Sequence, residues 1–199
     1  MSLLKFTPCR SEYKGPSYAS EYDTGADVYS SFAGLTEEEL LKDNSELENN
    51  DIIHLVNGSI TYIYLQPGCS VKVPTGIKLI LPQTTYYENV MDSYLEEEEA
   101  LSFRWGVQVR PKSGRAYKEQ LTITNAPGSV DNQFSGELQV LLTNLSQDSV
   151  CTINHLEKIA QIVPEKVYQL GNWWEVSNEE LASVRGTRQE GGFGSTGLN

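Results

Sequence analysis

The 199-residue sequence has few cysteines and no long apolar run. Its three cysteines are odd in number and lack CxxC spacing, so they predict neither a disulfide framework nor a cysteine metal site. Apolar stretches such as residues 77–82 are far shorter than the roughly 20 residues that span a bilayer. Residues 1–8 also lack the apolar region of a signal peptide. We therefore expect a single-domain cytoplasmic protein without a membrane span.

Basic side chains are also scarce. The 15 Lys and Arg residues are outnumbered by 27 Asp and Glu residues, which gives a net charge of −12. Such a charge repels phosphate backbones and predicts that no nucleic acid is bound. Residues 33–60 and 84–103 each carry a net charge of −6 and together account for all of it. We interpret them as two acidic inserts, at about residues 33–60 and 84–104, in a neutral scaffold that can still present local cations to an anionic substrate.

Histidine is the scarcest catalytic residue. His54 and His155 are the only two, and His54 lies in an acidic insert. A Ser/His/Asp triad or a His/Cys metal site is therefore not expected. The GxxxxGK[ST] and GxGxxG patterns are also absent, so P-loop and Rossmann nucleotide sites are not predicted.

What the sequence does contain is a series of short β-favouring runs separated by Gly, Pro and Asn. Residues 60–65, for example, are β-branched and aromatic and end at the turn formed by Gln66, Pro67 and Gly68. This pattern predicts an all-β barrel or sandwich. The expected strands are residues 60–65, 71–73, 77–81, 105–109, 121–124, 138–142, 151–153 and 158–164.

Helix signals are few. Capping boxes at residues 36–39 and 177–180 predict the starts of two short helices. Residues 89–103 have a helix-favouring composition, but their run of four Glu weakens a helix and leaves a solvated loop as the alternative. The Gly-rich residues 191–199 are predicted to be flexible.

Three segments carry residues suited to phosphate chemistry. In residues 110–115, cations and a hydroxyl flank a glycine that lets an anion approach the backbone, although an exposed basic turn has the same composition. In residues 125–131, Asp131 follows a turn as a candidate general base or a cap. Residues 188–197 combine an arginine, hydroxyls, glycines and one aromatic, which suits either a phosphate lid or a disordered tail.

Taken in order, these segments resemble the five motifs of the trimeric dUTP pyrophosphatases, or dUTPases. The ordered set is much more specific than any one motif, and the two acidic inserts are the only segments that lie outside the family pattern. The matching segments are residues 24–28 (TGADV), 110–114 (RPKSG), 128–138 (GSVDNQFSGEL), 158–162 (KIAQI) and 191–197 (GGFGSTG), with a strand turn at residues 73–77 (VPTGI).

The resemblance implies an all-β, jelly-roll-like barrel that forms a homotrimer with active sites shared between subunits. Residues 1–199 would form one dUTPase-like domain with two partly helical inserts and a flexible lid over residues 186–199. The implied activity is the hydrolysis of dUTP to dUMP and pyrophosphate, which limits uracil in DNA and supplies dUMP.

The third motif would hold the nucleoside and the attacking water. Asp131 would activate the water that attacks the α-phosphorus. Asn125 would bind the edge of uracil together with the backbone of Gly128 and Val130. Phe134, where the family usually has Tyr, would pack on the deoxyribose and exclude a 2′-hydroxyl.

The other motifs would hold the triphosphate. Mg²⁺ would be bound mainly by phosphate oxygens and water, with Asp27 acting through water. Arg188 fits the spacing of the lid arginine better than Arg185 does. Lys112 and Lys158 stand where the family commonly has Arg, and because Lys lacks the bidentate fork we expect weaker phosphate binding. The expected phosphate and lid residues are Lys112, Ser113, Gly114, Gln161, Arg188, Phe193, Gly194, Ser195 and Thr196.

Two alternatives remain. The dCTP deaminases share the fold and much of the third motif, but their catalytic Glu falls ten residues after the Asp, at Leu141 here. A regulatory protein could instead use the dUTPase fold to bind a partner through its acidic inserts. Acidic runs are more often solvated faces, so we expect the inserts to lie on the trimer surface, where they either have no catalytic role or bind a basic protein partner.

Overall fold

The computed structural model divides into two compact units, Met1–Gln169 and Leu170–Asn199. In the second unit, Asn178 and Glu179 are helical, in agreement with the helix start predicted at Ser177. Predictions that concern the C-terminal lid lie outside the described residues. The structure describes residues 4–44, 53–92, 97–169 and 175–179.

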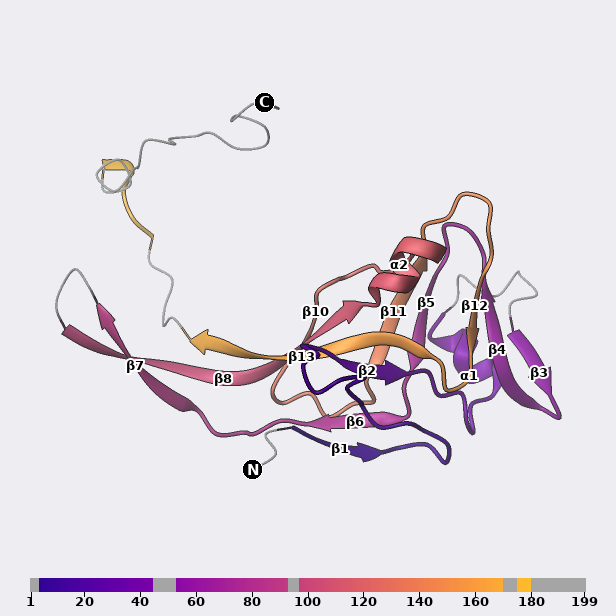
Figure 1. The fold of residues 1–199 in the computed structure, drawn as a ribbon, viewed down its shortest axis with the longest axis horizontal. Coiled ribbons are helices and arrows are strands. Elements are labelled where there is room, and N and C mark those ends of the chain that lie inside the picture. The colour runs from indigo at the N-terminus through magenta and orange to yellow at the C-terminus, as the bar shows by residue number, and fades with distance from the viewer. Residues whose placement is uncertain (1–3, 45–52, 93–96, 170–174, 180–199) are drawn as a thin grey trace. The chain divides into compact units, whose positions relative to one another are not determined.

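The first unit consists mainly of strands, as the sequence predicts (Figure 1). No helix in the described part of the chain is long and apolar enough to cross a membrane. In chain order its elements are β1 (Lys5–Pro8), β2 (Ala26–Tyr29), α1 (Glu37–Lys42), β3 (Ile53–Val56), β4 (Ser59–Leu65), β5 (Ser70–Pro74), β6 (Ile77–Ile80), β7 (Tyr86–Asp92), β8 (Glu97–Pro111), α2 (Ser113–Glu119), β9 (Leu121–Ile123), β10 (Gly128–Val130), β11 (Gln139–Asn144), β12 (Cys151–Asn154) and β13 (Lys158–Gln169).

The strands pair antiparallel throughout the described residues. The largest sheet has the order β10-β8-β13-β2, with β7 paired to the first part of β8. Three smaller sheets have the orders β5-β11-β9, β12-β4-β3 and β1-β6. Many neighbours, such as β2 and β13, are far apart in sequence, which is typical of Greek-key and jelly-roll architectures. The predicted, mostly β fold is therefore confirmed.

The core is formed by the inward-facing residues of these alternating strands. Val28 on β2, Ile63 and Leu65 on β4, and Val71 and Val73 on β5 have no exposed surface. Burying each such side chain contributes about 1.5–3 kcal/mol. The same residue types made these segments recognisable as strands in the sequence.

The first acidic segment is partly helical, as predicted. The Thr36 hydroxyl accepts a hydrogen bond from the Glu39 N–H at 3.2 Å, and the Glu39 carboxylate accepts from the Thr36 N–H at 3.0 Å. Leu40 is buried in the core. Asn44 fixes the end of α1 to β5, since it donates to the Leu40 carbonyl and accepts from the Lys72 N–H at 2.7 Å. This segment is therefore attached to the barrel by specific packing.

The second acidic segment is a β-hairpin, so the helix considered for residues 89–103 is wrong. Strands β7 and β8 pair in register from Tyr86 and Phe103 to Asp92 and Glu97, and they project as a twisted ribbon in Figure 1. Phe103 is buried and stacks on Tyr86 with ring centroids 5.3 Å apart. It also contacts Tyr168, its partner on β13. The C-terminal end of the hairpin is held in its extended conformation by pairing with β13, a strand distant in sequence. Local composition does not reveal this pairing.

Candidate functional site

The largest sheet brings together residues from three of the predicted motifs. Gln161 on β13 pairs with Asp27 on β2 and with Arg110 on β8, and Lys112 follows β8 directly. The side chains of Asp27, Lys112 and Gln161 meet because β13 lies between the other two strands.

Asp27 is the centre of this cluster and is only 2% exposed. Its Oδ1 accepts hydrogen bonds from Lys112 Nζ and, at 3.3 Å, from Gln161 Nε2, while its Oδ2 lies 2.7 Å from Lys158 Nζ. Burial raises the pKa of the Asp27 carboxyl, but the hydrogen bonds from Lys112 and Lys158 outweigh burial and hold the pKa below its ordinary value. The hydrogen bond with Asp27 also raises the pKa of Lys158. An ionised Asp27 thus holds two ammonium groups beside each other, where an anion can reach them.

The segment after β8 is a helix, and the basic turn considered from the sequence is absent. Ser113 and Gly114 are exposed in the first turn of α2, and apart from its chain neighbours and the backbone of α2 no atom lies within 4 Å of the place where a Gly114 Cβ would stand. Arg115 is buried and donates to Glu119 at 2.7 Å and to the Thr152 carbonyl at 2.8 Å. Arg115 therefore fixes α2 to the barrel, while Ser113 and Gly114 are open to a ligand.

The loop between β9 and β10 forms a small pocket. Asn125, Gly128 and Val130 line it, and its volume is about 90 Å³. A Cβ on Gly128 would stand 3.2 Å from Nδ2 of Asn125 and 3.5 Å from Val109. Gly128 therefore allows the Asn125 amide to lie close to the backbone of β10, where amide and backbone groups can together bind a flat polar ring.

Asp131 directly follows β10 and is exposed. No described side chain donates to its carboxylate. Asn132 fixes this loop by donating to the carbonyls of Pro82 and, at 3.2 Å, Trp105. A free carboxylate on a fixed loop can orient a water molecule and accept its proton.

Phe134 completes the turn after Asp131. Its N–H donates to the Asp131 carbonyl at 3.0 Å, and the residue is 47% exposed. A Cβ on Gly136 would stand 2.7 Å from Phe134 Cζ, so Gly136 leaves room for the ring. Asp131 and Phe134 line one pocket of about 640 Å³.

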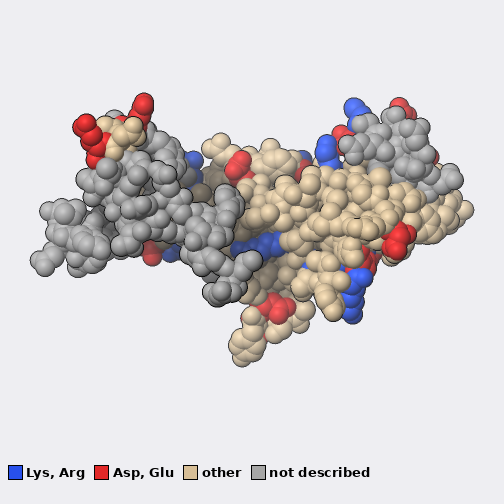
Figure 2. All heavy atoms as spheres, turned by 90° about the horizontal axis from the view of Figure 1, so that it is seen from above, with Lys and Arg blue, Asp and Glu red and all other residues tan. Residues whose placement is uncertain are grey.

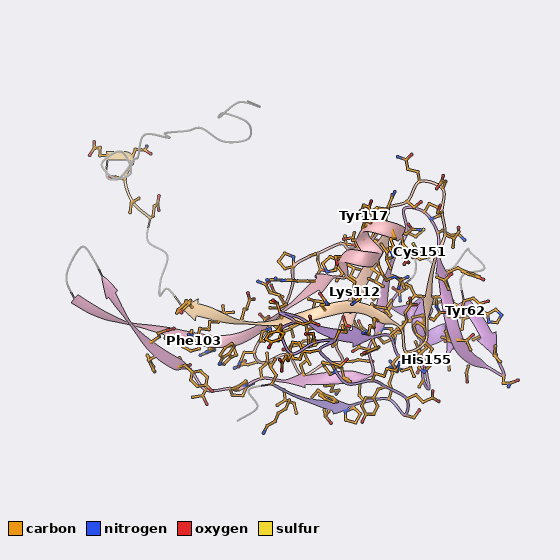
Figure 3. The ribbon with its side chains drawn as sticks, viewed as in Figure 1. Tyr62, Phe103, Lys112, Tyr117, Cys151 and His155 are labelled. Carbon is orange, nitrogen blue, oxygen red and sulfur yellow. The ribbon has the colours of Figure 1, made fainter. Side chains whose placement is uncertain are left out.

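The two parts of the predicted site lie apart within one chain. Val130 pairs with Val107, five residues before Lys112. Five residues of extended strand span about 17 Å. Figure 3 accordingly shows Lys112 beside α2, away from the ribbon that carries Phe103. A single chain thus holds Asp131 and the Asp27 cluster at separate places.

Several predicted residues lie outside the described part of the chain. They are Arg185, Arg188, Phe193, Gly194, Ser195 and Thr196. Figure 2 shows one face on which the described Lys and Arg residues lie in small, separate groups.

The sequence interpretation missed two residues that shape the site. Lys158 was noted only as a replacement for Arg, yet it is a direct partner of Asp27. Its position in the fourth motif, three residues before Gln161, could have identified Lys158 as a site residue. Asn132 carried no signal, because its carbonyl partners come from other parts of the chain.

Comparison with known proteins gives consistent matches. A dUTPase family model matches residues 107–197. The deoxyuridine 5′-triphosphate nucleotidohydrolase of Desulfotalea psychrophila is 40% identical over 134 residues, which cover 67% of this chain and 72% of that protein. The protein of the same name from Neorickettsia sennetsu is 39% identical over 147 residues, covering 74% and 79%.

Solved structures share the fold. A mutant dUTPase of Staphylococcus bacteriophage 80alpha with dUpNHpp has a TM-score of 0.63 over 100% of both chains, at 15% identity. A mutant dUTPase of phage phi11 of S. aureus, which coordinates a structural Mg(II) ion, has a TM-score of 0.57 over 89% of this chain and 99% of that one, at 14% identity. Since relatives about 40% identical are covered over more than two thirds of their length, this chain belongs to the dUTPase family.

Proposed function

We propose that this protein hydrolyses dUTP to dUMP and pyrophosphate. The observation that carries the proposal is the identity of about 40% to deoxyuridine 5′-triphosphate nucleotidohydrolases. The Asp131 loop and the cationic cluster around Asp27 supply groups suited to the two halves of this reaction. Its cellular consequence would be to limit uracil in DNA and to supply dUMP, in the cytoplasm.

Asp131 acts as the general base. It orients a water molecule, takes one proton from it, and the water oxygen attacks the α-phosphorus. The bond between the α-phosphorus and the oxygen that bridges to the β-phosphorus breaks, and pyrophosphate leaves with that oxygen. The exposed carboxylate, free of side-chain donors among the described residues, supports this role.

The small pocket at Asn125 binds uracil. Its amide and the backbone of Gly128 and Val130 can match the alternating donors and acceptors of a pyrimidine edge. Phe134, which lines the neighbouring pocket together with Asp131, packs on the deoxyribose and leaves no room for a 2′-hydroxyl. Leu141 also lines the pocket and offers no proton-transferring group, which argues against deamination of dCTP.

The triphosphate binds to the cluster around Asp27. Lys112 is held in place by Asp27, and the open positions of Ser113 and Gly114 allow phosphate oxygens to approach. Gln161 supports the phosphates and water from β13. Arg188, Ser195 and Thr196 of the lid close over the β- and γ-phosphates, with Phe193 and Gly194 over the base.

The enzyme works as a homotrimer with shared sites. The separation between Asp131 and Lys112 along β8 supports this, because one nucleotide must reach both. Asp131 of one subunit would then act on a triphosphate held by Lys112 of its neighbour. The full chain would form one functional domain, with residues 186–199 as the lid and the acidic inserts on the trimer surface.

Mg²⁺ enters as part of the substrate. No three His, Cys, Asp or Glu residues gather to hold a metal ion in the described regions. Both Asp27 oxygens already have partners, so this carboxylate would meet the ion only through water. An ion bound to the triphosphate would supply neutralisation of the charge on the departing pyrophosphate.

Replacement of the general base tests this mechanism. Asp131→Asn should lower kcat by at least about 100-fold, because the amide cannot take the proton of the water. The affinity for the non-hydrolysable analogue dUpNHpp, measured by calorimetry, should stay within about threefold. A variant that turns over dUTP at the wild-type rate would show that another residue is the base.

A further inference from the structure

The pocket beside Asp131 is walled by strands β8 and β13. Gly106 and Arg104 of β8 and Glu165 and Val167 of β13 line it opposite the Asp131 loop. Glu165 pairs with Gly106, and Val167 pairs with Arg104, so these alternate pairs lie on the same face of the sheet. Arg104, the last residue of the second insert, therefore reaches the proposed reaction site.

Arg104 is the only cation among the described residues that line this pocket. Its Nε donates to the Thr85 hydroxyl at 3.2 Å, which fixes the guanidinium plane. Its two terminal nitrogens have no partner in the described ranges. One face of the guanidinium fork is thus anchored and the other is available to a ligand.

The neighbouring acids do not neutralise Arg104. Glu165 instead accepts a hydrogen bond from Gln108, which in turn accepts from Arg110 at 2.6 Å. Asp131 is free of side-chain donors in the described structure. A pocket with two carboxylates disfavours an anionic substrate, so a cation available to phosphate is required there.

The spacing suits a phosphoryl group. Arg104 lies three residues from Val107, the partner of Val130, or about 10 Å along the strand. An extended Arg side chain covers much of that distance and presents two parallel N–H donors, the geometry that matches phosphate oxygens. A phosphoryl group between Arg104 and the water on Asp131 would contact both.

We propose that Arg104 binds a non-bridging oxygen of the α-phosphate. This inference rests on the proposed function, because it places the α-phosphorus beside Asp131. Arg104 supplies a bidentate contact to phosphate, which Lys112 cannot make because it is a lysine. The C-terminal end of the second insert is then part of the substrate site, while its acidic residues lie outside the pocket.

The hairpin stem is built to hold Arg104 still. Phe103, the residue before it, stacks on Tyr86 and lies 5.8 Å from the Tyr168 ring. On the same side as these rings, Lys166 lies 2.7 Å from Glu88. Ring packing and an ion pair thus clamp β7, β8 and β13 together on the face away from the pocket.

Binding of deoxyuridine, dUMP and dUpNHpp to Arg104→Ala tests the assignment. Loss of a charged hydrogen bond should weaken dUMP and dUpNHpp by about 10-fold or more and leave deoxyuridine within about twofold. Arg104→Lys should recover part of the affinity for dUMP. Lys42→Gln is the control, because it removes an exposed cation from α1, which contributes no residue to this pocket, and all three affinities should stay within about twofold.

Calorimetric affinities decide the outcome. Equal dUMP affinity in wild type and Arg104→Ala would overturn the proposal, as would an equal loss for deoxyuridine, which would place the effect in the base pocket. Should Arg104→Ala fail to fold, wild-type dUMP affinity in Arg104→Lys would overturn the bidentate contact. Failure of the wild-type protein to hydrolyse dUTP would instead contradict the proposed function, so the two failures are distinguishable.

Discussion

Asp27 illustrates how one buried carboxylate can organise several cations. It is in contact with Lys158 and Gln161 on β13 and with Lys112 at the start of α2. Because its two oxygens are shared among these partners, Asp27 fixes where the ammonium groups lie. Its role in the site is thus positional, and its ionisation is linked to the stability of the fold.

Asp27→Asn should remove a pH-dependent part of the stability. The pKa of Asp27 is lower in the folded protein, so its ionised form stabilises the fold above the ordinary Asp pKa of about 4, and this stabilisation is lost as pH falls further. At pH 7 the free energy of unfolding of the variant should be about 1–3 kcal/mol lower than that of wild type. This loss is smaller than the loss on breaking a fully buried ion pair, because both lysines are partly exposed. Urea unfolding at one protein concentration measures the difference, which should shrink near pH 3. An equal difference at both pH values would show that Asp27 is not ionised in the fold.

The residues of the site were mostly visible in the sequence, whereas their arrangement was not. Asp131, Asn125 and Lys112 stand in short segments whose order resembles the family motifs. The pairing of Lys158 with Asp27 depends on β2 lying beside β13, and no local pattern shows this. Arg104 was overlooked for the same reason, since its pocket is completed by β13 and the Asp131 loop.

At the scale of elements, local signals succeeded where local interactions determine the structure. The helix start at Thr36 follows from side chain and backbone groups three residues apart. The strand segments were likewise recognisable from β-branched and aromatic residues.

The composition of residues 89–103 was misleading. It favours a helix, but the pairing of β7 with β8 and the packing of Phe103 against Tyr168 make these residues a hairpin.

The first acidic segment should contribute to stability more than to catalysis. Deletion of residues 36–51 removes Leu40 from the core, which should cost about 2–3 kcal/mol and lower Tm by roughly 4–12 °C. Turnover of dUTP should remain within a fewfold, because α1 contributes no residue to either site pocket. Calorimetry and a pyrophosphate assay measure the two effects.

A charge-only variant separates packing from acidity. Glu37→Gln combined with Glu38→Gln removes two exposed acids but keeps Leu40 and the capping box. Its Tm should stay within about 3 °C of wild type. Loss of turnover in the deletion variant with an intact oligomer would contradict the assignment of this segment to the surface.

At the scale of the whole molecule, the proposed homotrimer makes a quantitative prediction. Asp131→Asn and Lys112→Ala chains should each be nearly inactive alone. Random mixed trimers of the two would contain one intact site in most assemblies, so a 1:1 mixture should recover about a quarter of wild-type activity. Co-refolding followed by size-exclusion chromatography and a pyrophosphate assay measures this. Mixed trimers without recovery would show that both residues serve the same subunit's site.

The central claim is the hydrolysis of dUTP at the α-phosphorus. Its most direct test is pyrophosphate release from dUTP compared with dCTP, dTTP and UTP, each with and without Mg²⁺. We predict release from dUTP with formation of dUMP, stimulated by Mg²⁺, and little release from the other three. Absence of pyrophosphate from dUTP would contradict the claim, and ammonia from dCTP would indicate a deaminase instead.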